Sequence, residues 1–438
     1  GRLDALDVVG QRALKYYAGQ QPGKLDADAL GRRSRALHLV GEIRNIRGDS
    51  AAGLAAFRQA AATTGELLAR DPDNAQRIFD HAQSVFWVGY IAYERKDLVD
   101  AERQFREYKR LADRLIAIEP GKTAWQLESS YAETNLGTLM FNQGRFYEAE
   151  TAFELGLNRI EKVVAVEGYK PERQLELGTM LNWLGMTRSK LAESASSLVV
   201  HRREVAIYEE VLRRDPSDAV AKYRLAIALQ WVGSAQCDLG DLRGAITTLN
   251  RSLELLGNLR AIEPANTEWQ ETQVRGLLTA AEFLGFARRF DDADKLLSDA
   301  TALHARMVKS DPTNKFWSGE LRSMIVKADI FLALAQGEAG RANRAGEEAV
   351  RTVKFIEDPA EQSELWRHVG DVQQSRGQRA QARESWQRAL KGLPVAPGTE
   401  PERFGLLKRL GQTVQAAQLA AILDKRGYLN PSYLRERK

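Results

Sequence analysis

Residue types that could support catalysis are scattered along this chain. The five histidines lie at least 43 residues apart, at His38, His81, His201, His304 and His368, whereas zinc sites usually draw ligands from closely spaced positions. Cys237 is the only cysteine and lies in an apolar stretch, where a thiol is normally inert. The sequence therefore predicts no metal site, no reactive thiol and no internal disulfide.

Two further patterns match catalytic signatures only in part. Gly121-Lys122-Thr123 matches the end of a phosphate-binding loop, but Ile116 stands where that loop needs its first glycine. Carboxylate pairs such as Asp291-Asp292 and Glu347-Glu348 fall at expected helix starts and on exposed faces, where they complement helix dipoles. We expect no enzymatic activity and no cofactor.

The elements that carry these residues repeat along the chain. Glycines recur every 48 residues at Gly41, Gly89, Gly137, Gly185 and Gly233. An acidic residue, usually followed by proline, keeps the same step from Asp71-Pro72 to Asp311-Pro312. Two signals in phase indicate a repeat array, in which stacked units build one continuous core.

Each repeat is expected to be a pair of antiparallel helices. In one unit, apolar residues recur at three- and four-residue steps over residues 127–140 and 146–164, on either side of a turn at 142–145. A glycine in the middle of a helix costs about 1 kcal/mol relative to alanine, so close packing of the second helix must compensate. Small residues twelve positions later are expected to face these glycines, at Ala101, Ala149, Ala245 and Ala293.

This pattern resembles the tetratricopeptide repeat. The C-terminal copy carries it most fully, with Trp366, Val369, Gly370, Ala382, Trp386, Ala389 and Pro394 at the family's positions, while Gln373 stands where an aromatic residue is usual. The other units have a longer period than the family's 34 residues, so both helices of each pair are expected to be longer. The resemblance implies an all-α fold, a right-handed superhelical solenoid of antiparallel helix pairs.

The array is expected to occupy residues 25–394, as about eight helical hairpins. Residues 1–24 are predicted to form an N-terminal helix, and residues 395–438 a linker, a capping hairpin and a frayed tail from Tyr433.

Two regions depart from the 48-residue period. At 192–197 we expect a longer or looser loop, and over 281–345 the glycine column lapses, so that the next turn is expected at Gly340-Arg341. At both places we favour a variation that the repeat tolerates over a functional hinge.

The resemblance also places a ligand groove along the first helix of each pair. It assigns these groove candidates: Arg35, His38, Glu42, Asn45, Phe86, Tyr90, Tyr93, Tyr131, Phe141, Asn142, Asn182, Lys190 and Gln230. Aromatic rings with interspersed amides suit an extended peptide or a helix. The alternative is that the long helices bury some of these rings between repeats.

Charge and hydropathy narrow the class of partner. The net charge of +4 comes from 63 basic and 59 acidic residues mixed along the chain, which argues against nucleic-acid binding. No apolar run is long enough to span a membrane.

The opening segment and the recurring acidic-Pro-x-Asn-x-x-Trp joints resemble arrays at the C-terminal end of bacterial signalling proteins. In those proteins a Toll/interleukin-receptor-like, Ser/Thr kinase or caspase-like effector precedes the array, often with a membrane segment between them. Both a cytoplasmic location and attachment to the inner membrane through a preceding segment are compatible with this resemblance.

Two functions follow from the sequence. The first is a non-catalytic module that binds a protein or peptide and serves sensing or assembly in a larger bacterial signalling protein. The alternative is a structural spacer or self-association scaffold without a separate ligand.

Overall fold

The computed structural model describes residues 8, 12, 15–16 and 25–438, and these form two compact units. The N-terminal helix expected over residues 1–24 lies almost entirely outside the described residues. Unit 1 runs to Met180 and unit 2 from Leu181 to the C-terminus. Helix α8 (Pro171–Lys190) contributes residues to both units.

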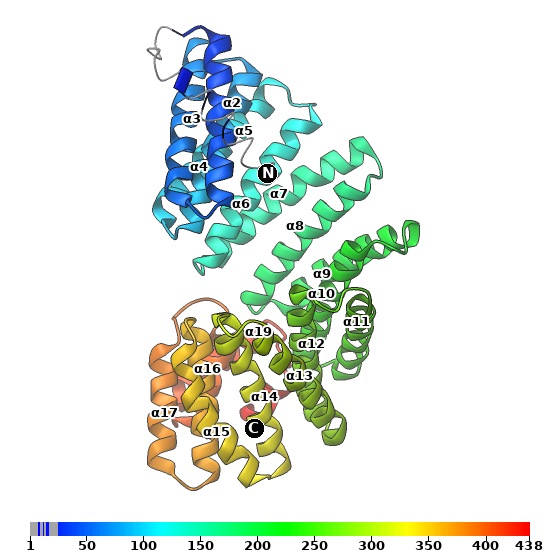
Figure 1. Ribbon diagram of the computed structural model, residues 1–438. Helices are drawn as coiled ribbons and strands as arrows, with labels where there is room; N and C mark the ends of the chain where they lie inside the picture. The colour runs from blue at the N-terminus through cyan, green and yellow to red at the C-terminus, as the bar shows by residue number, and fades with distance from the viewer. Residues whose placement is uncertain (1–7, 9–11, 13–14, 17–24) are drawn as a thin grey trace. The chain divides into compact units, whose positions relative to one another are not determined.

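Unit 1 is a row of antiparallel helix pairs, drawn from blue to cyan in Figure 1. Its helices before α8 are α2 (Ala27–Ile46), α3 (Ser50–Arg70), α4 (Ala75–Glu94), α5 (Leu98–Ile118), α6 (Thr123–Asn142) and α7 (Phe146–Glu167). The core continues from one pair to the next, because a single cluster of buried residues includes Leu68 of α3, Leu111 of α5 and Trp125 of α6.

Unit 2 continues the same arrangement with shorter helices toward its end (Figure 1). Its helices after α8 are α9 (Ser194–Arg214), α10 (Ala219–Asp238), α11 (Leu242–Ile262), α12 (Thr267–Phe286), α13 (Phe290–Ser310), α14 (Arg322–Gln336), α15 (Ala339–Thr352), α16 (Pro359–Ser375), α17 (Arg379–Gly392), α18 (Glu400–Arg409), α19 (Thr413–Lys425) and α20 (Pro431–Arg437). A π-helical turn, η2 (Trp317–Leu321), precedes α14, and a short 3-10 turn, η3 (Val353–Phe355), follows α15. The predicted all-α solenoid of antiparallel helix pairs is confirmed within each unit.

The turns inside the pairs keep the 48-residue step more faithfully than the glycines do. A residue with positive φ ends the first helix of six successive pairs, at Gly48, Lys96, Gly144, Ala192, Gly240 and Arg288. Only glycine adopts this conformation without strain, and three of the six positions carry another residue. The backbone geometry of the turn is therefore set by the pairing of the helices rather than by the residue at the turn.

The mid-helix glycines pack against the side chain sixteen residues later, which is a ring at every one of them except Gly233, where it is Leu249. A Cβ atom added at Gly41 would lie 2.8 Å from the Phe57 ring, and one added at Gly137 would lie 2.6 Å from the Phe153 ring. The expectation that the small residues twelve positions later supply the closest approach is therefore only partly right. Ala101, Ala149, Ala245, Ala293 and Ala382 are all fully buried, but at Gly41, Gly89, Gly137, Gly185 and Gly370 the nearest side chain is the ring.

The loop at 192–197 is neither longer nor looser than the others, so that expectation is wrong. Ala192 has φ of 55° and stands 48 residues after Gly144, in phase with the other turns. Ser197, where alanine is usual, is fully buried, and its hydroxyl donates a hydrogen bond of 3.0 Å to the Gly185 carbonyl. This hydrogen bond satisfies the buried serine and links the two helices of the pair.

The irregularity over 281–345 comes from one inserted residue. The turn at Arg288 is in phase, and the next turn falls at Gly337, 49 residues later. The π-helical turn η2 lies between them, and such a turn accommodates one extra residue. The expected turn at Gly340-Arg341 is wrong, because Gly340 lies inside α15 and Gly337 adopts the left-handed conformation at the end of α14.

The expectation of a frayed tail is also wrong. Residues Pro431–Arg437 form α20, and Tyr433 is 3% exposed, packed against Phe404 at 5.0 Å between ring centroids. The Tyr433 hydroxyl donates a hydrogen bond of 2.8 Å to Asp424. The aromatic ring and its hydroxyl therefore anchor the last residues of the chain onto the hairpin of α18 and α19.

Candidate functional site

In unit 1, the groove candidates lie on α2, α4 and α6, the first helices of three successive pairs. Arg35, Glu42, Tyr131 and Asn142 are exposed, whereas His38, Asn45, Phe86, Tyr90, Tyr93 and Phe141 are half-buried. Phe141 packs edge-on against Phe146 at 5.4 Å. These residues therefore form a partly accessible face of unit 1, with its rings half inserted into the protein.

A cavity of about 390 Å³ opens between α2 and α4. Arg35, His38 and Glu42 line it, together with Asp80 and Gln83 of α4. His38 Nε2 is 2.8 Å from the Ser84 hydroxyl, and burial lowers the pKa of His38 while raising that of Glu42. The cavity thus offers a guanidinium, two carboxyl groups, an amide and a neutral imidazole to a bound chain.

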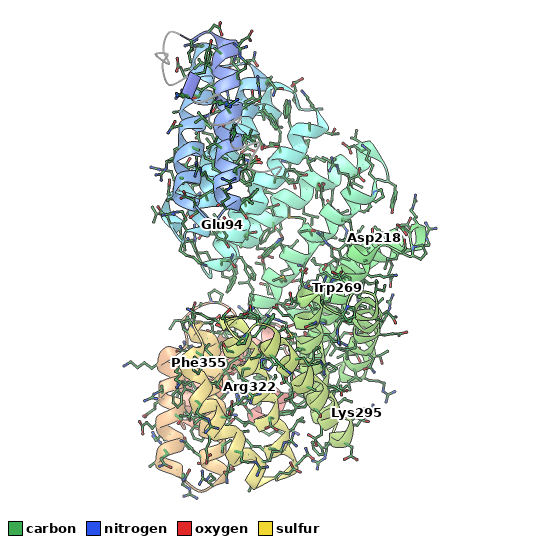
Figure 2. All side chains as sticks on the ribbon, in the orientation of Figure 1. Glu94, Asp218, Trp269, Lys295, Arg322 and Phe355 are labelled. Atoms are coloured by element: carbon green, nitrogen blue, oxygen red, sulfur yellow. The ribbon has the colours of Figure 1, made fainter. Side chains whose placement is uncertain are left out.

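The rings of α4 serve two roles. Phe86 contacts Trp87 at 5.4 Å, Tyr108 at 5.5 Å and Tyr90 at 6.0 Å between centroids, so it belongs mainly to the core between repeats. Tyr90 lies nearer the surface, and a hydrogen bond with Glu94, labelled in Figure 2, raises the pKa of its hydroxyl. The alternative of rings buried between repeats therefore applies to Phe86 more than to Tyr90.

Tyrosine hydroxyls on this face are held by the following repeat. The Tyr93 hydroxyl accepts a hydrogen bond from the Asn142 amide. Tyr131, 36% exposed, donates a hydrogen bond of 2.7 Å to Glu176, and burial together with Glu176 raises its pKa. Each ring is thus oriented from two adjacent pairs, which lowers the entropy cost of presenting it to a ligand.

Glu128 is a polar residue that the sequence analysis missed. It is 6% exposed, accepts hydrogen bonds from the Tyr108 hydroxyl at 2.7 Å and from the Gln83 amide, and burial raises its pKa. Gln83 also lines the cavity, so Glu128 fixes one of its walls. The signal was available, because Glu128 is an acid on the face of α6 that otherwise carries Trp125 and Ala132.

Three candidates belong to unit 2. Lys190 is exposed at the end of α8, and Asn182 donates a hydrogen bond of 3.4 Å to the Met186 sulfur. Gln230 lies between helices, where its amide donates to the Thr272 carbonyl at 3.2 Å and the Ser252 hydroxyl at 3.4 Å. Its hydrogen-bonding capacity is thus directed into the protein rather than toward a ligand.

The residues considered for catalysis are held in structural contacts. His81 Nδ1 is 3.0 Å from the Thr64 hydroxyl, and His304 Nε2 is 2.8 Å from the Trp317 carbonyl. Cys237 is 1% exposed, and burial raises the pKa of its thiol. Lys122 pairs with Glu119 at 3.2 Å in the joint between α5 and α6.

The described residues provide neither a metal-binding cluster nor a membrane-spanning helix. Among residues 25–438 and the few described before them, no three His, Cys, Asp or Glu side chains are grouped as metal ligands would be. No helix in this part of the chain combines the length and apolarity needed to cross a membrane.

Comparison with solved structures places the fold among helical repeat proteins. The apo form of RapI aligns with a TM-score of 0.59 at 11% identity, covering 89% of this chain and 92% of that chain. A Rap protein complexed with competence and sporulation factor aligns with a TM-score of 0.47 at 10% identity, covering 89% and 93%. BtubC from P. vanneervenii aligns with a TM-score of 0.45 at 17% identity, covering 58% and 90%.

No protein-family model and no curated sequence matches this chain. The structural likeness to RapI, at 11% identity, therefore shows the fold alone. Together with the helix pairs, it supports a helical repeat fold of the tetratricopeptide type.

Proposed function

We propose that this helical repeat array is a non-catalytic module that binds an extended or helical segment of a protein partner along α2, α4 and α6 of unit 1. The observation that carries the proposal is the open cavity that Arg35, His38 and Glu42 of α2 line together with residues of α4, the helix that also carries Tyr90 and Tyr93. Charged and amide groups supply hydrogen bonds, and Tyr90, Tyr93 and Tyr131 supply apolar area. Interface energy is usually concentrated in a few such aromatic and arginine side chains.

The wider role is also part of this proposal. We infer that the array is the sensing or assembly part of a larger bacterial signalling protein, since its acidic-Pro-x-Asn-x-x-Trp joints resemble those of such proteins. Binding of a partner would then favour one arrangement of the array over another, by as much as the partner's affinity differs between the two.

A triple substitution tests the binding face. Peptides selected from a random display library on the purified chain should lose at least tenfold in affinity when Tyr90, Tyr93 and Tyr131 are changed to alanine. Truncating a single hot-spot side chain costs about 2 kcal/mol or more, and tenfold corresponds to about 1.4 kcal/mol. Tyr147→Ala is the matched control, since Tyr147 is 52% exposed on α7, outside the proposed face. The affinity is measured by isothermal titration calorimetry.

Sedimentation velocity of the same variants separates the alternative function. If the triple variant binds the peptides unchanged but shifts the oligomeric state of the chain, the surface serves self-association and the peptide-binding proposal is wrong. Unchanged sedimentation with lost peptide affinity supports it.

A further inference from the structure

Unit 2 contains a cavity of about 450 Å³ that the peptide-binding proposal does not use. Five helices line it: α12, α14, α16, α18 and α20. Leu278, Glu282 and Phe286 face it from α12 at four-residue spacing, which places them on one side of that helix. A second cavity of about 360 Å³ shares Glu282 and Glu364 with the first, so the two adjoin.

Most cations around the cavity are already paired. Lys327 pairs with Glu361 at 2.7 Å and Glu364 at 2.6 Å, and Arg367 pairs with Glu402 at 2.6 Å. Arg409 pairs with Asp371 at 2.6 Å and with Glu436 at 2.9 Å. These three cations therefore form ion pairs with five carboxylates, and none of the three pairs with Glu282.

Glu282 is the carboxylate that is left over. No hydrogen bond or ion pair within the described chain involves it, and it keeps accessible surface because it opens into the cavity. Burial raises its pKa, and the charges of Glu364 and Asp238 add to this, while Lys327 and Arg367 oppose it. The Glu282 carboxylate is therefore accessible from the cavity and has no internal partner, and a cation bound beside it would stabilise its charged form.

The wall beside Glu282 is aromatic. Phe286, one helical turn further along α12, meets Phe331 of α14 edge to face with 4.9 Å between ring centroids. Both rings line the cavity, as does Met324. Aromatic faces attract organic cations that have shed part of their hydration shell, whereas a small hydrated metal ion prefers several oxygen ligands.

We propose that this cavity binds an organic ammonium ion, with the charged nitrogen at Glu282 and its apolar stem against Phe286 and Phe331. The unpaired carboxylate supplies the charge, and the aromatic wall selects a carbon-bearing cation over an inorganic one. Arg435 of α20 also lines the cavity, and no ion pair of the described chain involves it. It is the internal cation that a ligand would compete with.

The test uses three probes that share a phenyl ring and differ in charge: a cation, a neutral alcohol and an anion. Calorimetric titration should show saturable binding of 2-phenylethylammonium, at least tenfold weaker binding of neutral 2-phenylethanol, and no binding of phenylacetate. The Glu282→Gln variant should bind the ammonium probe at least tenfold more weakly. Glu268→Gln, the same change at another exposed position of the same helix that does not line the cavity, should bind like the unmodified chain.

Two further measurements keep the proposal falsifiable. The melting midpoint of Glu282→Gln should rise, because desolvation and the neighbouring carboxylates Glu364 and Asp238 raise the pKa of Glu282 and so disfavour its charged form. A fall would mean that Glu282 is a structural partner and would contradict the proposal. Arg435→Ala should tighten binding of the ammonium probe by removing the competing cation. Equal affinity for the ammonium and the alcohol, or full affinity in Glu282→Gln, would overturn the assignment.

Discussion

Gly137 lies in the middle of α6 with the Phe153 ring of α7 against its backbone, and the equivalent contact recurs along the array. In unit 1 the ring belongs in turn to Phe57, Phe105 and Phe153. In unit 2 the ring opposite Gly185 is that of His201. His201 is fully buried, stacks on Trp231 and lies 2.7 Å from Glu204, and burial lowers its pKa to about 3. A neutral imidazole thus replaces the phenyl ring without changing how the two helices meet.

Substituting Gly137 by alanine should destabilise the chain. The new Cβ would lie 2.6 Å from the Phe153 ring, and overpacking of this kind costs typically 1–3 kcal/mol, while the gain in helix propensity is about 1 kcal/mol. We expect a net loss of about 1 kcal/mol in urea denaturation. Gly257→Ala is the control, because nothing lies within 4 Å of its added Cβ. It should be stabilising, and a stabilising Gly137→Ala would refute the packing argument.

Lys96 holds a turn conformation that glycine adopts more easily. Its φ is 65°, and Gly48 and Gly144 occupy the same position in the neighbouring pairs. A non-glycine residue in the left-handed region costs roughly 1–2 kcal/mol, so Lys96→Gly should raise the free energy of unfolding by about 1 kcal/mol after the entropy of the unfolded glycine is subtracted. The reciprocal change Gly144→Ala should lower it, and equal effects of the two changes would contradict this reading of the turn.

At the scale of elements, a single residue changes the register of unit 2. The π-helical turn η2 absorbs the extra residue between the turns at Arg288 and Gly337. Trp317 opens η2 and is 3% exposed, with its ring nitrogen donating to Glu271 of α12. Arg322, labelled in Figure 2 at the start of α14, pairs with Glu348 of α15 at 3.2 Å. These contacts anchor the inserted turn at both ends, so the insertion is packed rather than loose.

The later elements shorten toward the length of an ordinary tetratricopeptide repeat. Gly377 follows Gly337 by 40 residues, and Gly411 follows Gly377 by 34. The ring contact persists there, since Trp386 packs on Gly370 and donates its ring N–H to Asp371 at 3.0 Å. The shorter helices bury less surface per pair, and the C-terminal segments of unit 2 supply additional contacts.

At the scale of the molecule, the last residues of unit 2 return to one of its early turns. The Leu429 amide donates to the Asp238 carbonyl at 2.6 Å, and the Asn430 amide donates to the Asp238 carboxylate at 2.8 Å. Ser194 donates to the other carboxylate oxygen at 3.0 Å. Asp238 thus joins α10 to the segment before α20, 192 residues away in sequence.

Removing the Asn430 side chain should weaken this junction. Asn430 also caps α20 by accepting a hydrogen bond from the Ser432 amide. Loss of a cap costs typically about 1 kcal/mol, and a buried acceptor left short of a donor costs about 1–3 kcal/mol, so Asn430→Ala should cost about 2 kcal/mol in total. Chemical denaturation measures the total, and hydrogen exchange should show faster opening at both Leu429 and the end of α10.

Asn250→Ala provides the matched control for the junction. Asn250 is exposed on α11 and makes no hydrogen bond in the described chain, so its loss should change stability by less than about 0.5 kcal/mol. If Asn430→Ala accelerates exchange in α20 alone and leaves α10 unchanged, Asp238 does not couple the two segments.

The sequence by itself determined the repeat, the helix pairs and the absence of a local catalytic signature, because periodicity and helical spacing are local properties of the chain. It placed the glycine column correctly but assigned its partner to the small residues, since spacing along a helix does not show which side chain of the opposing helix comes closest. Only the packed structure shows that the rings do.

Tertiary structure alone decided three further features. The residues expected to be a frayed tail form α20, because Tyr433 packs against apolar residues of α18 and α19. No short window of sequence reveals that contact. The shifted turn at Gly337 came from one residue absorbed in η2. The unpaired Glu282 depends on which cations five helices bring together. Each of these depends on contacts between residues distant in sequence, and such contacts exist only once the helices have packed.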